Sequence, residues 1–137
     1  MGEITKGDGY AVATSLDALG EGYGFRKVRK QLDVTAFGVN AITMPPSYES
    51  GPHFHDEQEE LYFVHRGTLV IKFGDGSEHE LGEGGAARVD AATVRSTANP
   101  SDSEDVVYLV VGGKDGYVGR DGREPAGEGT ARPPVKD

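Results

Sequence analysis

The stretch GPHFHDEQEELYFVHRG, residues 51–67, decides the fold and indicates the chemistry of this chain. His53 and His55 are separated by one residue, so in an extended segment their side chains project to the same face. Pro52 favours an extended entry into this segment, because proline restricts the backbone that precedes it. A glutamate at the start of the next apolar run would complete two histidines and one carboxylate, a set typical of metal sites with open coordination positions.

The spacing of these residues resembles the first conserved motif of the cupin superfamily. The pattern is His53-x-His55, four residues, Glu60, six residues and Gly67. The resemblance implies that Glu60 is the carboxylate ligand, because it lies seven positions before Gly67, and it leaves Glu59 as the fallback. It therefore implies a site in which His53, His55 and Glu60 bind one divalent metal: iron, manganese, nickel or zinc.

Residues 84–99 resemble the second cupin motif, which aligns without gaps. Gly84 and Asn99 match the pattern, whereas Arg95 stands at the position of the histidine ligand. A guanidinium stays protonated and has no lone pair to give to a metal, so Arg95 cannot replace that histidine. Three further positions depart from the family: Asp90 replaces a proline, Ala92 a glycine, and Ser47 the leading glycine of the first motif.

The fold that the resemblance implies is all-β, a cupin-like double-stranded β-helix (jelly-roll barrel) with little helix. Twenty-one glycines and regularly spaced short apolar runs favour the same class. The predicted strands are residues 10–14, 35–43, 61–64, 68–73, 77–81, 86–89, 94–97 and 106–111. Gly74-Asp75-Gly76 is predicted to form a hairpin turn between two of them.

The length of 137 residues predicts one domain with a single core. We expect a barrel over residues 35–112 and an N-terminal extension, residues 1–34, that packs on it. Residues 113–137 are rich in glycine, proline and charge, which predicts a tail that forms no core and is mobile or lies across a neighbour.

Composition excludes several classes of partner and site. The 14 basic and 23 acidic residues give a net charge of −9, which argues against nucleic acid and anionic membranes as partners. No apolar run approaches the roughly 20 residues that span a bilayer, so we expect a cytoplasmic protein. The chain has no cysteine, so any metal must be bound by nitrogen and oxygen ligands.

Strand alternation sorts the residues around the motif. It places Tyr62 on the inner side with Glu60, where Tyr62 can contact a ligand, and it turns His65 away. His79 is expected to be a packed or paired histidine, although it is the best substitute for a fourth ligand.

Arg95 leaves three arrangements open. In the first, the metal is bound facially and Arg95 anchors the carboxylate or enolate of an anionic substrate. In the second, Arg95 pairs with Glu60 and the barrel binds a small molecule without metal. In the third, Arg95 points outward.

Two functional hypotheses follow. The leading hypothesis is a small-molecule cupin with a polar barrel pocket, in which a divalent metal supports dioxygenase or isomerase chemistry on an anionic small molecule, and Arg95 and Tyr62 contact the substrate. The alternative is a metal-free binding or sensing cupin without catalysis. The family resemblance also implies a homodimer.

Overall fold

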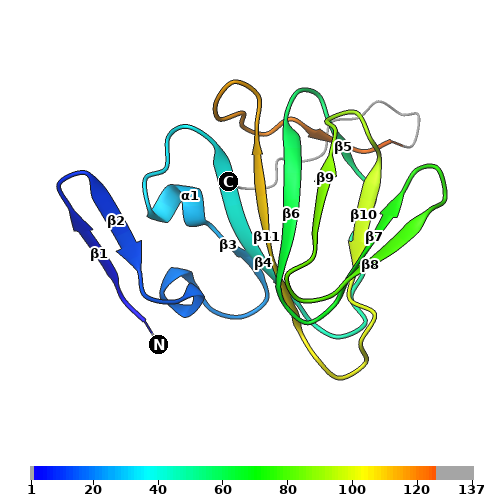
Figure 1. Ribbon diagram of the computed structural model, residues 1–137, viewed down its shortest axis with the longest axis horizontal. Helices are drawn as coiled ribbons and strands as arrows, with labels where there is room; N and C mark the ends of the chain where they lie inside the picture. Colours follow the sequence, from blue (N-terminus) through cyan, green and yellow to red (C-terminus); the bar gives the residue numbers. More distant parts are fainter. Residues whose placement is uncertain (1, 126–137) are drawn as a thin grey trace.

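Two antiparallel sheets enclose the core of the protein in a computed structural model that describes residues 2–125 (Figure 1). The larger sheet has the strand order β3 (Gly24–Arg26), β4 (Gly38–Met44), β11 (Val106–Gly113), β6 (Glu59–Arg66) and β9 (Ala86–Val89). The smaller sheet has the order β10 (Arg95–Ala98), β7 (Leu69–Phe73) and β8 (Glu78–Leu81). Within residues 2–125, helix is limited to a 3-10 turn, Leu16–Leu19, and to α1, Val28–Gln31. The predicted all-β fold with little helix is confirmed.

Alternation along the strands builds the core between the two sheets. In β6, Tyr62 and Val64 are buried, whereas Leu61 and Phe63 are exposed. Leu69 and Ile71 of β7 are fully buried and contribute the facing side. A one-residue shift of β6 would exchange its buried and exposed sets, so burial of one face fixes the register that places Glu60.

Tight turns connect the strands at the positions that glycine and aspartate indicate. The predicted turn at Gly74-Asp75-Gly76 joins β7 to β8, and the amide of Gly76 donates to the carbonyl of Phe73. The carboxylate of Asp75 accepts hydrogen bonds from the amide and hydroxyl of Ser77. These local bonds close the hairpin without any contribution from the core.

All eight predicted strands are present, seven with shifted ends and β9 with the predicted bounds, and four short strands were not predicted. The four are β1 (Ile4–Gly7), β3, β5 (Phe54–His55) and β12 (Gly122–Arg123). Each has two to four residues, which is too short for an alternating pattern to stand out from its surroundings. None of the described helices is long and apolar enough to cross a membrane.

The predicted N-terminal extension has two parts. β1 pairs with β2 (Tyr10–Ala13) in a hairpin that stands away from the barrel (Figure 1). Beyond it, Leu19 and Arg26 are buried, and Arg26 lies opposite Ala41 of β4. The side chain of Gln31 donates to the carbonyl of Leu19, which ties α1 to the 3-10 turn.

The chain beyond β11 is not a separate tail in its described part. β12 pairs with β5, so residues 122 and 123 lie beside His55 and Phe54. Residues 114–125 therefore return to the barrel at the position of the histidine motif, and residues 126–137 lie outside the described part. The sequence did not predict this pairing, because the pairing involves only two residues of each strand and β12 follows a glycine-rich segment.

Gly67 should be the glycine least tolerant of substitution. Its φ is +83°, and a Cβ there would lie 2.5 Å from the carbonyl oxygen of Asp105. We expect Gly67→Ala to lower the free energy of unfolding by about 3 kcal/mol, from left-handed strain plus steric conflict. Gly76 has a similar φ of +91° and open space around it, so Gly76→Ala should cost about 1 kcal/mol. Urea unfolding of both variants measures the difference, and equal losses would contradict a steric role for Gly67.

Candidate metal centre and its pocket

His53 and His55 are placed by backbone pairing rather than by a long strand. The amide of His53 donates to the carbonyl of Arg95, and the amide of Arg95 donates to the carbonyl of His53, both at 2.9 Å. Two residues later, the amide of His55 donates to the carbonyl of Ala91 at 2.8 Å. The extended segment between them brings the imidazole rings to 5.1 Å between centroids. The predicted placement of both side chains on one side is therefore present.

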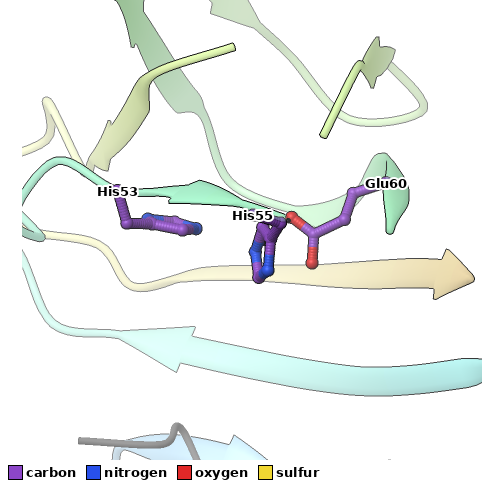
Figure 2. Close-up of side chains that lie close together, drawn as sticks. All are labelled: His53, His55 and Glu60. Atoms are coloured by element: carbon purple, nitrogen blue, oxygen red, sulfur yellow. Dashed lines mark ion pairs between the residues drawn. The ribbon is translucent and has the colours of Figure 1, made fainter. Parts of the chain in front are cut away.

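Glu60 completes the group from the start of β6. Figure 2 shows His55 between His53 and Glu60, and one ligand atom of each of the three lies within 4.8 Å of the others. Glu59 points to the opposite face, where it is exposed and pairs with Arg88 at 3.1 Å. Strand alternation thus places Glu60, not Glu59, beside the histidines.

Arg95 lies behind Glu60 and is completely buried. Its Nη2 donates to Oε1 of Glu60 at 2.6 Å, and its Nε donates to the hydroxyl of Tyr62 at 3.3 Å. The remaining Nη1 donates to three backbone carbonyls, those of residues 90, 91 and 93. Each nitrogen of the guanidinium therefore has an acceptor in the protein.

This placement bears on the three arrangements considered for Arg95. The ion pair with Glu60 is present, and an outward orientation is not. Arg95 does not line the pocket described below, whereas Tyr62 and Glu60 do. Contact of Arg95 with an anionic ligand stays a prediction, because it requires the guanidinium to exchange a protein acceptor for the ligand.

Charge around Glu60 keeps its carboxyl ionised despite burial. Burial alone would raise its pKa, but the hydrogen bond and charge of His55, followed by those of Arg95, lower the pKa to about 2. Burial and the neighbouring carboxylate raise the pKa of Tyr62, so its hydroxyl stays protonated and donates to Oε1 of Glu60 at 3.1 Å. Glu60 is therefore an anion under all ordinary conditions.

Asp121 orients His55 and was not predicted as a site residue. Its Oδ1 lies 2.7 Å from Nδ1 of His55, and it also accepts from the side-chain amide of Gln58 at 2.6 Å. Its Oδ2 accepts the backbone amides of Glu57 and Gln58. Burial raises the pKa of Asp121, but these donors outweigh it and lower the pKa to about 2.

The partner on Nδ1 decides which nitrogen of His55 faces the site. Burial lowers the pKa of His55, but its contact with the charged carboxylate of Glu60 and its hydrogen bond to Asp121 outweigh burial and raise that pKa. In the neutral form that a metal requires, we assign the proton to Nδ1, which donates it to Asp121, so that Nε2 carries the lone pair. Nε2 is buried and lies 3.5 Å from Oε1 of Glu60, which is long for a hydrogen bond. Histidines that bind a metal usually donate the N–H of their other ring nitrogen to a carboxylate in this way.

The other two histidines lie outside this group. His65 is exposed on the outer face of β6, as alternation predicts. His79 is exposed on β8 in the smaller sheet, where its ring packs edge-on against Phe73 at 5.7 Å and its Nε2 lies 3.3 Å from the hydroxyl of Ser77. It is not placed to act as a fourth ligand.

A cavity of about 520 Å³ opens beside the three residues. His53, His55 and Glu60 form its polar end, and Asp121 with Gln58 continues that wall. The remaining lining is largely apolar and aromatic and comes mainly from β3, β4, β11 and the loop before β5. The volume lies in the range that accommodates drug-sized ligands in known sites.

The residues present fit a divalent metal. They supply two imidazole nitrogens and one ionised carboxylate, and the buried Nε2 of His55 is directed to the same point as Glu60. A metal and Arg95 repel each other, but the carboxylate of Glu60 lies between the guanidinium and the histidines and attracts both cations. Three protein ligands would leave further coordination positions open.

Comparison with known proteins identifies the family. The family model described as "Cupin domain" matches residues 40–112, more than half of the chain. The chain belongs to the cupin family. No curated protein matches this cupin.

Solved cupin structures resemble the barrel. A cupin protein from Bacteroides fragilis has 24% identity over 69% of this chain and 80% of its own, with a TM-score of 0.61. A sugar phosphate isomerase of the cupin superfamily from Silicibacter pomeroyi has 28% identity over 83% and 69%, with a TM-score of 0.53. A predicted oxalate decarboxylase from Thermotoga maritima has 23% identity over 55% and 64%, with a TM-score of 0.51. The predicted cupin fold is thereby confirmed.

The stability of the metal-free cupin should fall in acid because of Glu60. Its lowered pKa means that the carboxylate stabilises the fold fully above its ordinary pKa of 4.5, and that this contribution is lost as the pH falls towards about 2. Glu60→Gln leaves Arg95 buried without a counter-charge, so we expect a loss of about 3 kcal/mol at pH 7.

The difference between wild type and Glu60→Gln should therefore shrink between pH 5 and pH 2. Urea unfolding across this range measures it. Glu59→Gln is the matched control, because its exposed carboxylate should change stability by less than about 1 kcal/mol. A difference that stays constant with pH would contradict the ionised, ion-paired state of Glu60.

Proposed function

We propose that this cupin binds one divalent metal, iron, manganese, nickel or zinc, through His53, His55 and Glu60 and acts on a small molecule in the adjoining pocket. The observation that carries the proposal is the convergence of these three side chains at the polar end of a cavity, with His55 held by Asp121. A structural role would not require two histidines and an ionised carboxylate to face an open cavity.

Arg95 is a fixed positive charge that weakens metal binding at this site without preventing it. Two unit charges 4 Å apart repel by about 4 kcal/mol at an effective dielectric of 20, and a divalent ion doubles the value. Glu60 lies between the two cations, so it lowers the repulsion while remaining available to the metal. The cost is weaker metal binding than in a site with a third histidine as fourth ligand.

The chain's own groups define the chemistry available. Glu60 stays ionised, the protonated Tyr62 hydroxyl lies beside it, and the apolar walls exclude water from the ligand. A bound divalent metal would supply Lewis-acid stabilisation of negative charge on substrate oxygens. This set suits isomerase or dioxygenase chemistry, and structural neighbours include a sugar phosphate isomerase and a predicted oxalate decarboxylase.

The alternative function is a metal-free cupin that binds or senses a small molecule. The observation that favours it is the ion pair of Arg95 with Glu60 at 2.6 Å, which already neutralises the carboxylate. The homodimer and the anionic character of the ligand stay predictions under either function.

Metal content separates the two functions. In untagged protein purified without chelator and supplied with each metal, we expect about one ion per chain by inductively coupled plasma mass spectrometry. His53→Ala/His55→Ala should lose it, whereas the control His65→Ala/His79→Ala should keep it. Absence of metal from the wild type, or equal content in both double variants, would favour the metal-free function.

Arg95→His tests the role of the arginine in the same site. It removes the cation behind Glu60 and adds an imidazole, so zinc affinity measured by chelator competition should rise by about tenfold or more. Arg95→Gln removes the cation without adding a ligand and serves as the matched variant, with thermal melting to check that each folds. Equal affinity of the two variants would show that position 95 does not face the metal.

A further inference from the structure

Aromatic side chains are concentrated around the pocket. The chain has six tyrosines, and five of them line the cavity: Tyr23, Tyr48, Tyr62, Tyr108 and Tyr117. Phe25 also lines it. A general apolar core would place such rings throughout the barrel, so their concentration at one cavity indicates a surface shaped for a flat apolar partner.

Three of these rings are open to solvent at the pocket. Tyr23 is 59% exposed, Phe25 41% and Tyr48 48%. Exposed aromatic groups that border a cavity mark a place where a ligand removes them from water. Tyr108, which belongs to the buried core, and Ile42, which packs against that core, also line the cavity.

Tyr48 is held in place before any ligand arrives. The loop that carries it is bonded to β10 and the segment beyond it: the amide of Asn99 donates to the carbonyl of Tyr48, and the amide of Ser50 donates to the carbonyl of Thr97. The same loop continues to His53, whose backbone pairs with Arg95. A fixed loop therefore presents an aromatic ring and a metal-ligating imidazole to one cavity.

Two hydroxyls of the apolar wall are already used inside the protein, whereas the hydroxyl of Tyr117 and Oδ1 of Asn40 are buried without a hydrogen-bond partner among the described residues. The hydroxyl of Tyr108 lies 3.2 Å from that of Thr97, and the hydroxyl of Tyr62 donates to Glu60. A sugar would bring more hydroxyls to this wall than the Tyr117 and Asn40 atoms can pair, so most of its hydrogen bonds to water would be lost without replacement. The wall is suited to a conjugated ring system instead.

Positive charge is also present along the lining. Arg29 of α1 stacks on the ring of Tyr117 at 4.0 Å, and Arg120 lies in the segment after β11; both line the cavity. Glu60 and Asp121 bring two carboxylates to the same lining, so an anionic group of a ligand is favoured only beside these two guanidinium groups. The ring of Tyr117 positions Arg29 beside the aromatic wall. The charge of Arg29 and the aromatic wall can therefore act on the same ligand.

We propose that the ligand of this pocket is a planar aromatic acid, with the ring system against Tyr48 and its neighbours, rather than a sugar phosphate or a two-carbon acid. This inference rests on the proposed function in one respect: the end of the ligand that reacts is placed at His53, His55 and Glu60. The aromatic contacts themselves do not require the metal.

Binding of two probes tests the proposal. Isothermal titration calorimetry with 2-naphthoate and with glucose 6-phosphate should show at least about tenfold tighter binding of the aromatic acid. Tyr48→Ser should weaken 2-naphthoate by about tenfold, whereas Tyr10→Ser, which removes an exposed tyrosine outside the pocket, should not change it. Thermal melting confirms that both variants fold. Preference for glucose 6-phosphate, or equal effects of the two substitutions, would overturn the proposal.

The same titrations on His53→Ala/His55→Ala separate this inference from the proposed function. Naphthoate binding that persists in this metal-free double variant supports the aromatic ligand independently of the metal. Naphthoate binding by a wild type that takes no metal supports the aromatic ligand and removes the metal function. Metal binding by the wild type without naphthoate binding supports the metal function and removes the aromatic ligand.

Discussion

A buried carboxylate must keep its charge inside an apolar barrel, and the ion pair of Glu60 with Arg95 meets that requirement. Arg95 has no exposed surface, and one of its nitrogens lies 2.6 Å from Oε1 of Glu60. Removing either partner would leave the other charge buried and uncompensated, at a cost of about 3 to 5 kcal/mol. The position of both side chains is therefore enforced by the stability of the barrel, whether or not a ligand is bound.

The same constraint organises the histidines. The backbone of His53 pairs with the backbone of Arg95, so the strand that positions the guanidinium also positions the first imidazole. The loop before β10 accepts hydrogen bonds from the amide of His55 and from Arg95 through the single carbonyl of Ala91. A shift of β10 would displace all three groups together. The geometry of the candidate metal site and the geometry of the ion pair therefore depend on the same backbone pairing.

Residues close together in the chain could be placed from the sequence, and residues brought together by the fold could not. One-residue spacing placed His53 and His55, and alternation in β6 separated Glu60 from Glu59. Asp121 lies 66 positions after His55 and follows a glycine-rich segment, so no periodicity connects them. Its contribution appears only when β12 pairs with β5, a contact of two residues on each strand.

The orientation of Arg95 required the fold for a different reason. The family position indicated a site residue, and the chemistry of arginine excluded a ligand, but neither specified whether the side chain faces the site or turns away. That choice depends on the backbone carbonyls of residues 90, 91 and 93, which converge on Nη1 only because the loop closes around it. Loop closure is a tertiary property that a single sequence pattern does not encode.

In the proposed metal site, an arginine at the position where the motif resemblance implies a histidine ligand would change the site without abolishing it. A third imidazole, as fourth ligand, would fill one coordination position, and the charge of Glu60 would then be balanced by the metal alone. An arginine behind Glu60 fills none, and it lowers the net negative charge that the three protein ligands present. Such a site binds its metal less tightly but leaves more positions for a ligand, and it favours ligands that bring negative charge of their own. The aromatic wall beside it then determines which anions can use those positions.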